Sequence, residues 1–310
     1  MANLAVVVDP EAPGRLVIRQ VADPAPSRSE AVVRVRAISL NRGEVRRAGM
    51  AAAGWRPGWD LAGEVERAAD DGSGPRPGTR VVGLVPEGAW AQRVAIPTNA
   101  LAALPDKVTF SQAATFPVAG LTALYALARA GLVVDRRVLV TGATGGVGDF
   151  AVQLARLAGA RVTALARRGD QAPALHQLGA HEVTVGDEIP PAPKYDVILD
   201  SVGGRTLGTA LAALAPGGIC VTFGVSAGAE VTFDARAFFI GGRATLYGFY
   251  LFQELGLEPA AVGLQRLADL VAGGQLTPHI SVERPWKDIG QVAEDLMARR
   301  FPGKAVLAVD

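Results

Sequence analysis

The sequence is poor in residues that carry metal or disulfide chemistry. It has 310 residues but one cysteine, Cys220, so no disulfide can form within the chain. With this single cysteine and three histidines (His176, His181 and His279), a zinc site built from Cys and His is disfavoured. Such cysteine usage fits a reducing compartment. We therefore expect a cytoplasmic protein without a bound metal.

Two classes of partner are also disfavoured by what is missing. The 31 Lys and Arg balance 30 Asp and Glu, and the arginines are scattered, so there is no basic stripe for nucleic acid. No apolar run approaches the roughly 18–20 residues that span a bilayer. The first residues, "MANLAVVVDPEAPGR", have no basic region before a short apolar run that stops at Asp9. We read no signal peptide there and expect no membrane partner.

The pattern of the chain changes along its length. Residues 1–115 hold short β-like runs separated by Pro and Gly turns, which predicts a compact, mostly antiparallel β domain. Residues 116–255 alternate strand-like and helix-like segments, and Pro117 is expected to divide the first helical segment into two pieces. Residues 256–310 add two amphipathic helices and a final strand. The fold class is α/β, with a parallel doubly wound sheet in the second region.

The segment 138–150, "VLVTGATGGVGDF", runs from a strand through a glycine turn into a helix. Gly145 would let the backbone approach a pyrophosphate, and Gly148 would let the helix pack closely on the sheet. The backbone N–H groups of Gly146 and Val147 would face the phosphates at the helix N-terminus. The motif is not a strict G-x-G-x-x-G, because Ala143 takes the place of the first glycine. In this strand–turn–helix setting it still predicts a dinucleotide site.

The end of the next strand distinguishes NADP from NAD. An acidic residue about 20 residues beyond the glycines would bind the ribose 2′-hydroxyl of NAD. The chain has Arg167 and Arg168 there, and the nearest carboxylate, Asp170, follows Gly169. Two guanidinium groups suit a 2′-phosphate, so NADPH is the expected cofactor. The alternative is a solvated pair of arginines after a strand.

Further segments give the sequence a family resemblance that extends over nearly the whole chain. They include "SLNRGEVRRAG" (39–49), "RPGWDLAGEVE" (56–66), "DSVGG" (200–204) and "GKAVLAVD" (303–310). With the glycine turn, they resemble the zinc-independent quinone oxidoreductase branch of the medium-chain dehydrogenase/reductase superfamily. The resemblance implies a GroES-like β domain, a Rossmann domain with the active-site cleft between them, and a C-terminus that returns to the first domain. It also implies a homodimer that pairs the Rossmann edge strand, here "ATLYGF" (244–249).

The resemblance carries site residues over to this sequence. Asn41 is the implied catalytic residue, and Tyr250 is a candidate proton donor or an aromatic wall beside the nicotinamide. Lys304 is a candidate for a phosphate or structural pairing. Glu44 and Asp60 are candidate cleft carboxylates, which act either as structural hydrogen-bonding groups or in acid–base catalysis. The implied cofactor contacts are Thr122, Gly145, Gly146, Val147, Arg167, Arg168, Val202, Gly203, Phe223, Gly224, Val225, Phe249 and Tyr250.

Other residues near these positions leave alternatives open. Family members often carry a tyrosine after the asparagine, but "NRGEVRRAG" is one residue shorter and lacks it. Arg42, Arg46 and Arg47 either steer an anionic substrate or form a solvated helix face. Several aromatic residues either line an apolar pocket or belong to the core. They are Trp55, Trp59, Trp90, Phe238, Tyr250 and Phe252.

Without a metal to polarise its substrate, the protein needs an acceptor that is electrophilic by itself. We therefore expect hydride transfer from NADPH to an apolar or aromatic quinone or α,β-unsaturated carbonyl compound. Asn41 would hydrogen-bond the carbonyl oxygen as charge develops on it. The alternative is a non-redox or redox-neutral enzyme, such as a cyclase, or an NADPH-binding sensor on the same fold.

Overall fold

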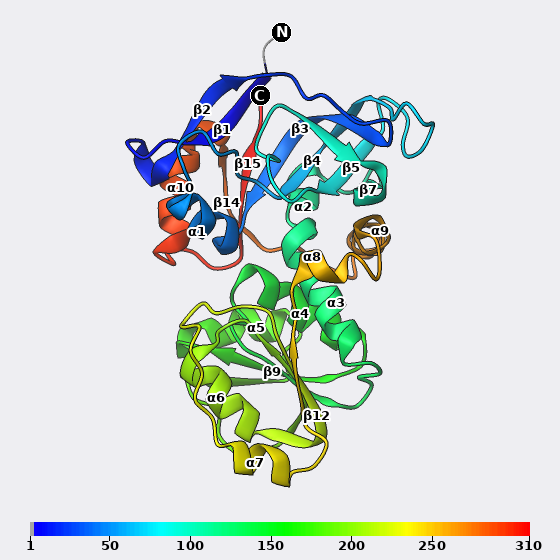
Figure 1. Ribbon diagram of the computed structural model, residues 1–310. Helices are drawn as coiled ribbons and strands as arrows, with labels where there is room; N and C mark the ends of the chain where they lie inside the picture. Colours follow the sequence, from blue (N-terminus) through cyan, green and yellow to red (C-terminus); the bar gives the residue numbers. More distant parts are fainter. Residues whose placement is uncertain (1–2) are drawn as a thin grey trace. The chain divides into compact units, whose positions relative to one another are not determined.

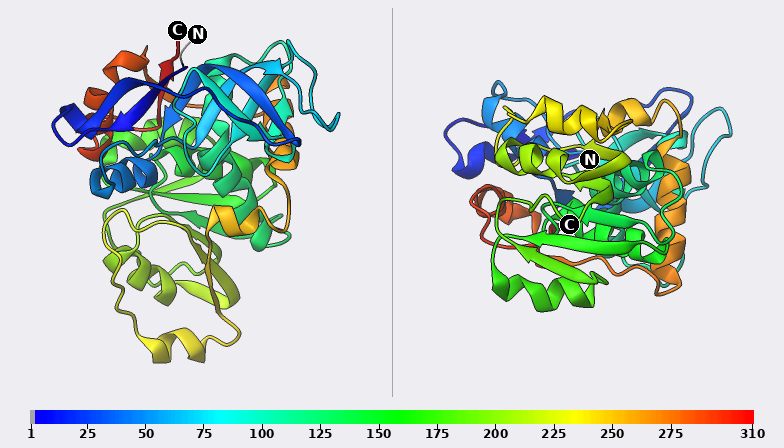
Figure 2. Two further views of the ribbon diagram at one scale, coloured as in Figure 1. Left: turned by 45° about the horizontal axis from the view of Figure 1, so that its top comes forward. Right: turned by 90° about the horizontal axis from the view of Figure 1, so that it is seen from below.

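The computed structural model describes residues 3–310, which divide into two compact units. Unit 1 comprises the chain up to Leu121 together with Leu255–Asp310, and unit 2 comprises Thr122–Glu254. The C-terminal segment therefore belongs to the same unit as the N-terminal segment, and its last strand lies beside β3 (Figure 1 and Figure 2). No helix within residues 3–310 is both long and apolar enough to cross a bilayer.

Unit 1 is built on a seven-stranded sheet with a separate pair, β1 and β2. The order in the sheet is β14-β15-β3-β4-β5-β7, and β6 also pairs with β3. Only β14 and β15 pair in parallel. The strands are β1 (Asn3–Val8), β2 (Leu16–Val21), β3 (Glu30–Leu40), β4 (Asp60–Arg67), β5 (Arg80–Leu84), β6 (Arg93–Pro97), β7 (Leu101–Ala103), β14 (Ile280–Pro285) and β15 (Lys304–Ala308).

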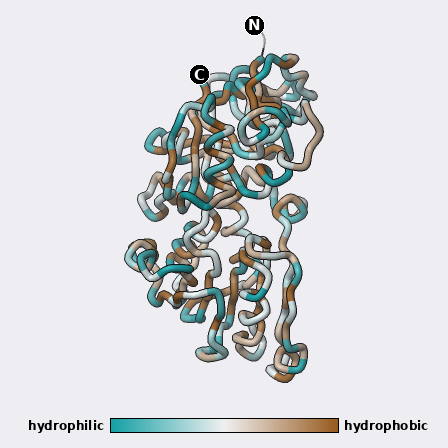
Figure 3. The backbone as a smooth tube through the Cα atoms, turned by 90° about the vertical axis from the view of Figure 1, so that its left-hand side faces the viewer, coloured by the Kyte–Doolittle hydropathy of each residue, from teal (hydrophilic) through white to brown (hydrophobic). Residues whose placement is uncertain are grey.

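Strand β3 shows why these residues form a sheet. Arg34 and Arg36 are exposed while Val33 and Val35 are buried, which is the period-two alternation of a strand with one solvated face. Figure 3 shows short hydrophobic and hydrophilic segments alternating along the chain. The helices of unit 1 are α1 (Arg42–Met50), α2 (Phe110–Ala114), α9 (Ala260–Ala272) and α10 (Ile289–Met297), with a 3₁₀ turn η1 (Pro13–Arg15). Pro117 lies in a π-helical turn, Phe116–Gly120, between α2 and α3, where its missing N–H breaks the regular helix.

Unit 2 is a six-stranded, entirely parallel sheet in the order β10-β9-β8-β11-β12-β13. The strands are β8 (Arg137–Val140), β9 (Arg161–Ala166), β10 (Glu182–Val185), β11 (Tyr195–Asp200), β12 (Leu214–Thr222) and β13 (Thr245–Gly248). The helices are α3 (Leu121–Arg129), α4 (Gly146–Leu157), α5 (Ala172–Gln177), α6 (Gly204–Ala212), α7 (Ala235–Ile240) and α8 (Leu251–Glu254). The strand order reverses between β8 and β11, which is where ligands bind in doubly wound sheets.

The fold class expected from the sequence is confirmed, but two strands were not predicted. β7 has only three residues, and β14 is largely exposed with only Ile280 and Val282 in alternation. Both strands owe their conformation to pairing, β7 with β5 and β14 with β15. Their local sequence carries too little pattern to signal a strand.

Candidate active site

The predicted site residues form two groups, one in each unit. The dinucleotide edge is the set of loops that follow β8, β9, β11, β12 and β13 in unit 2. The polar cluster consists of Ser39, Asn41, Glu44, Asp60 and Lys304 in unit 1.

The glycine turn leads directly from β8 into α4. Gly145 is the N-cap of α4, and Gly146 and Val147 are its first two residues. The amides of this first turn have no partner within the helix, and they carry the positive end of the helix dipole. Gly145 is exposed, and Gly146 and Val147 are half-buried. The turn therefore offers accessible N–H donors to an anion.

Two glycines in this turn are required by the close packing of its backbone. A Cβ on Gly148 would lie 2.3 Å from the carbonyl oxygen of Gly142, so no side chain fits there. Gly142 itself has a φ of +60°, and a Cβ there would lie 2.3 Å from Oγ of Ser201. The helix start is thus held against the end of β8, as a pyrophosphate-binding turn requires. The turn fits a dinucleotide.

Arg167 and Arg168 directly follow β9, the neighbour of β8 in the sheet. The Arg168 guanidinium donates from Nε and Nη2 to the two carboxylate oxygens of Asp170, at 3.0 and 3.1 Å. This hydrogen-bonded pair raises the pKa of Arg168 and lowers the pKa of Asp170. A 2′-phosphate would therefore compete with Asp170 for Arg168. In the sequence, Asp170 stands two residues after Arg168, and this short spacing could have predicted the ion pair.

The remaining predicted cofactor residues also follow strands of unit 2. Val202 and Gly203 follow β11, Phe223–Val225 follow β12, and Phe249 and Tyr250 follow β13. Because all strands are parallel, these segments leave the sheet at one edge. Thr122 is the exception, since it lies buried in α3 ahead of β8.

Aromatic rings and a close backbone approach shape part of this edge. The rings of Phe223 and Phe249 meet edge to face with centroids 6.3 Å apart. Tyr250 is 61% exposed and its ring lies 5.7 Å from that of Phe252. A Cβ on Gly203 would lie 2.4 Å from the carbonyl oxygen of Gly228. The loops after β11 and β12 therefore pack tightly, whereas Tyr250 keeps its ring in solvent.

A buried network that the sequence reading missed joins the ends of three strands. The Asp200 carboxylate accepts hydrogen bonds from Oγ1 of Thr141 at 2.7 Å, from N of Gly203 at 3.1 Å and from Oγ1 of Thr222 at 3.2 Å. Burial raises the pKa of Asp200, and the hydrogen bonds oppose that rise. Thr141, Asp200 and Thr222 lie at the ends of β8, β11 and β12. Polar residues closing buried strands were the signal that could have revealed them.

The polar cluster of unit 1 is assembled from four elements. Ser39 lies on β3, Asn41 caps α1, Glu44 is in the first turn of α1, and Asp60 and Lys304 begin β4 and β15. The strand register places Ser39 opposite Asp60. Ser39, Glu44, Asp60 and Lys304 are buried, and Asn41 is half-buried.

Asp60 is the centre of the cluster. Its Oδ2 accepts from Oγ of Ser39 at 2.6 Å, from Nδ2 of Asn41 at 2.7 Å and from Nζ of Lys304 at 3.3 Å. Its Oδ1 accepts from the backbone N–H of Val118 at 2.9 Å. This number of donors, together with the ammonium group, stabilises Asp60 as a buried carboxylate.

Asn41 and Glu44 are joined by two hydrogen bonds. Oε1 of Glu44 accepts from the backbone N–H of Asn41 at 2.7 Å and from Nδ2 of Asn41 at 3.0 Å. The backbone bond is half of a capping box at the start of α1. Burial raises the pKa of Glu44 well above its ordinary value, and the charge of Asp60 adds to the rise, while Lys304 opposes it.

These contacts bear on the role predicted for Asn41. Its Nδ2 donates one hydrogen to Asp60 and the other to Glu44, and its Oδ1 accepts from Nζ of Lys304 at 2.7 Å. An amide nitrogen has only two hydrogens. For Asn41 to bind a carbonyl oxygen, one of these two bonds must therefore be exchanged.

Several alternatives left open by the sequence are decided by packing. Trp90 is fully buried in the core of unit 1 and its Nε1 donates to the carbonyl oxygen of Ser39, so it does not line a pocket. Arg42 does not belong to a solvated face, because it is half-buried and its Nη1 donates to the carbonyl of Leu296 at 2.7 Å. That hydrogen bond gives a partner to a backbone carbonyl group in the last turn of α10.

Three more of the aromatic and arginine candidates make contacts within their own units. Trp55 packs against the core of unit 1, and its Nε1 donates to Oε2 of Glu87 at 3.0 Å. Arg47 lies over the Trp55 ring, 4.7 Å from its centroid. Phe238 packs against the core of unit 2. None of these contacts points to a substrate.

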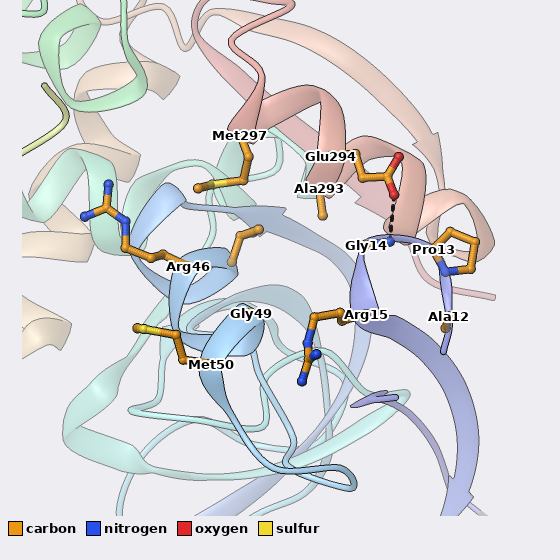
Figure 4. Close-up of a pocket in the computed structure, with 11 residues that line it drawn as sticks. Ala12, Pro13, Gly14, Arg15, Arg46, Gly49, Met50, Ala293, Glu294 and Met297 are labelled. Atoms are coloured by element: carbon orange, nitrogen blue, oxygen red, sulfur yellow. Dashed lines mark hydrogen bonds between the residues drawn. The ribbon is translucent and has the colours of Figure 1, made fainter. Parts of the chain in front are cut away.

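A cavity of about 580 Å³ lies in unit 1 between η1, α1 and α10 (Figure 4). Its lining includes Arg46, Met50 and Met297, and at one side the N–H of Gly14 donates to Oε1 of Glu294 at 2.9 Å. No member of the polar cluster lines this cavity. The predicted chemistry therefore does not belong to it.

A catalytic zinc needs Cys, His and carboxylate side chains in one cluster. Within residues 3–310, no group of three or more His, Cys, Asp or Glu side chains is arranged to hold a metal ion. Cys220 is buried in β12, and burial raises the pKa of its thiol well above the ordinary value. In the polar cluster, the positive charge comes from the Lys304 ammonium instead. The residues present do not fit zinc.

Comparisons with known proteins agree with this architecture. The alcohol dehydrogenase GroES-like domain family matches residues 27–106, and the zinc-binding dehydrogenase family matches residues 146–264. The mitochondrial NAD(P)H oxidoreductase RTN4IP1 of Mus musculus is 29% identical over 249 residues, 72% of this chain. That match spans 61% of the length of the mouse protein.

Two solved structures are similar over almost the entire chain. A quinone oxidoreductase from Pseudomonas syringae superposes with a TM-score of 0.86 at 28% identity, covering 99% of this chain and 100% of the other. A mycobacterial protein solved in complex with NADPH gives a TM-score of 0.87 at 26% identity, covering 98% of this chain and 99% of the other. Together with the two family matches, these likenesses show that the chain belongs to the quinone oxidoreductase branch of the medium-chain dehydrogenase/reductase superfamily.

Proposed function

We propose that the protein is an NADPH-dependent oxidoreductase that reduces a quinone or an α,β-unsaturated carbonyl compound without a catalytic metal. The observation that carries this proposal is the dinucleotide edge of unit 2. There, a glycine turn at a helix N-terminus and a pair of arginines follow adjacent parallel strands. The NADPH complex of the mycobacterial relative and the quinone oxidoreductase relative support it.

The chain's own residues would hold each part of the cofactor. The amides of Gly146 and Val147 would bind the pyrophosphate, and Arg167 and Arg168 would bind the 2′-phosphate. The loops after β11, β12 and β13 would contact the adenosine and nicotinamide ends, with the Phe223–Phe249 pair as an apolar wall. When bound, the nicotinamide supplies the hydride.

The polar cluster would bind the carbonyl oxygen of the substrate that accepts the hydride. Asn41 is the proposed donor to the carbonyl oxygen, with its amide held by Asp60, Glu44 and Lys304. Because residues 3–310 contain no set of metal ligands to polarise the substrate, we propose an acceptor that is electrophilic by itself. Residues 42–50 contain no tyrosine, so the proton would come from water, from the ribose hydroxyl of the cofactor or from Tyr250.

The cofactor proposal is tested by removing the arginine pair. We expect the double variant Arg167→Ala, Arg168→Ala to raise the dissociation constant of NADPH by about tenfold or more, with little change for NADH. Asp170→Asn is the matched variant, since freeing Arg168 should tighten NADPH binding. Binding is measured by calorimetry with both cofactors. Equal losses for NADPH and NADH would contradict the 2′-phosphate assignment.

The redox proposal is tested with acceptors. NADPH oxidation, followed by its absorbance, should depend on a quinone or an enone in a panel that also contains simple ketones and alcohols. If the protein binds NADPH but consumes none with any acceptor, the alternative of a non-redox enzyme or an NADPH-binding sensor is favoured.

We also propose a homodimer formed through β13. This strand is the last in the parallel sheet of unit 2, and its residue Leu246 is 43% exposed. An exposed apolar edge strand is a template for pairing with a second copy. Leu246→Lys should therefore shift the molar mass measured by light scattering from dimer to monomer. A wild type that is monomeric at micromolar concentration would exclude this arrangement.

A further inference from the structure

The hydrogen bonds of Lys304 leave no ammonium hydrogen for Glu44. An ammonium group has three hydrogens. Those of Lys304 are taken by the carbonyl oxygen of Leu40 at 3.1 Å, Oδ1 of Asn41 at 2.7 Å and Oδ2 of Asp60 at 3.3 Å. Glu44 therefore shares the cluster with a second carboxylate but not with a cation of its own.

The two oxygens of Glu44 have very different surroundings. Oε1 accepts both hydrogen bonds from Asn41. Oε2 is buried and has no hydrogen-bond partner among residues 3–310. A charged carboxylate oxygen buried without a donor is costly, whereas a protonated oxygen costs less. The arrangement thus favours a proton on Oε2 and leaves Oε1 as the accepting carbonyl oxygen.

We propose that Glu44 is a positioning residue that works as a neutral carboxylic acid, holding one amide hydrogen of Asn41 in a bond that can be exchanged for a substrate oxygen. A neutral carbonyl oxygen is a weaker acceptor than a carboxylate. The bond from Asn41 to Glu44, at 3.0 Å, is also longer than the bond from Asn41 to Asp60, at 2.7 Å. Asp60 therefore fixes the amide, and Glu44 is the partner that releases it.

Ionisation of Glu44 would reverse this arrangement. The Oε2 proton would leave to solvent, and the amide of Asn41 would be held between two carboxylates. The new charge would also lie beside the oxygen on which negative charge develops in the reaction, where it opposes that charge. The charged groups that act on Glu44 are Asp60 on β4, which opposes its ionisation, and Lys304 on β15, which favours it. We expect ionisation of Glu44 to prevent the Asn41 amide from donating to a substrate oxygen.

The direct test follows the side chain of Asn41 by NMR and needs no catalytic activity. The sequence has only three asparagines, Asn3, Asn41 and Asn99, so labelling asparagine with ¹⁵N gives three resolvable side-chain amides. In the wild type, the Asn41 amide signals should titrate with an apparent pKa well above that of an ordinary glutamate, because Glu44 is buried beside Asp60. In Glu44→Gln they should remain constant over the same pH range.

The control is Glu64→Gln, which removes an exposed carboxylate of β4 that pairs with Arg36. It should leave the titration of Asn41 unchanged. A titration that persists in Glu44→Gln, or an Asn41 signal that does not move in the wild type, would overturn the proposal. The infrared carbonyl band of a protonated carboxyl group gives a second measure of the neutral state. It should be present in the wild type at pH values below the Asn41 titration and absent in Glu44→Gln.

The catalytic part of this inference rests on the proposed function and is tested separately. With an acceptor found in the panel, kcat of the wild type should fall by about tenfold or more as pH rises through the Asn41 titration. Glu44→Gln should keep its kcat to higher pH. If no acceptor is reduced, the proposed function fails while the NMR titration still decides the state of Glu44. If kcat is lost equally in both proteins, Glu44 does not control Asn41.

Discussion

The polar cluster of unit 1 and the dinucleotide edge of unit 2 are built in opposite ways. The cluster uses buried side chains, with every amide hydrogen of Asn41 and every ammonium hydrogen of Lys304 assigned to an acceptor. The edge relies on backbone N–H groups and on exposed arginines. The first arrangement is preorganised, but burying its charged and polar groups is energetically costly. The second has its arginine donors exposed to solvent. Variants should therefore harm the two groups in different ways.

The largest effect should come from the cluster. Lys304→Met leaves Asp60 buried without its cation and should lower the free energy of unfolding by about 3–5 kcal/mol, measured by urea denaturation. The double variant Asp60→Asn, Lys304→Met should recover part of that loss. As a control, Arg36→Met breaks the exposed ion pair with Glu64 and should cost at most about 1 kcal/mol. Equal losses for Lys304→Met and Arg36→Met would mean that the buried ion pair contributes no more to stability than the exposed one.

The next largest effect is the pH dependence of the protein's stability. The folded pKa of Glu44 is raised, so the folded protein keeps a proton that the unfolded chain releases. Wild-type stability should therefore fall as pH rises from the ordinary glutamate range to the folded pKa, by up to about 1.4 kcal/mol per pH unit. Glu44→Gln lacks this proton. The stability of Glu44→Gln relative to the wild type, measured by thermal unfolding, should therefore increase as pH rises over the same range. If this difference in stability stays constant with pH, Glu44 is charged in the folded protein.

The dinucleotide edge should be sensitive to backbone crowding rather than to charge. Gly148→Ala places a Cβ against the carbonyl of Gly142 and should weaken NADPH and NADH binding alike, by about tenfold, through a cost of about 1–3 kcal/mol. Gly169→Ala is the matched control, since a Cβ there meets nothing within 4 Å. Calorimetric titration of both variants checks this. Preserved binding in Gly148→Ala would show that the turn tolerates movement.

The smallest effect is a gain of stability. Gly49 lies inside α1, which carries Asn41 and Glu44 at its start, and a Cβ there would meet nothing within 4 Å. Gly49→Ala should therefore stabilise the protein by about 0.5–1 kcal/mol, because alanine loses less conformational entropy in a helix. Cofactor binding, which depends on unit 2, should not change. A lower melting temperature would mean that α1 needs the freedom of glycine.

The dinucleotide edge was largely predictable because its signals are local. A strand, a glycine turn and a helix occupy one stretch of sequence, and the arginine pair follows the next strand. The parallel order of the strands then places the loops after them at one edge. The pairing of Arg168 with Asp170 was not predicted. A guanidinium group can donate to a phosphate or to a carboxylate, and the sequence does not say which of the two it binds.

The polar cluster was predictable only as separate candidates. Asn41, Glu44, Asp60 and Lys304 were each named, but nothing in the sequence joined residue 304 to residue 41. Their contact depends on the pairing of β15 with β3, which brings the C-terminal segment into unit 1. Ser39 was missed for the same reason, since its partner Asp60 lies on the neighbouring strand.

The sequence by itself determined the α/β class, the glycine turn with its arginines, and the scarcity of cysteine and histidine. Each of these depends on residue type and short spacing, which the chain carries directly. Only the tertiary structure decided which acceptors bind the amide hydrogens of Asn41 and that Lys304 forms an ion pair with Asp60. It also decided that one oxygen of Glu44 is buried without a hydrogen-bond partner. Those facts depend on burial and on contacts between residues distant in sequence, which fix the protonation of a group only after the chain has folded.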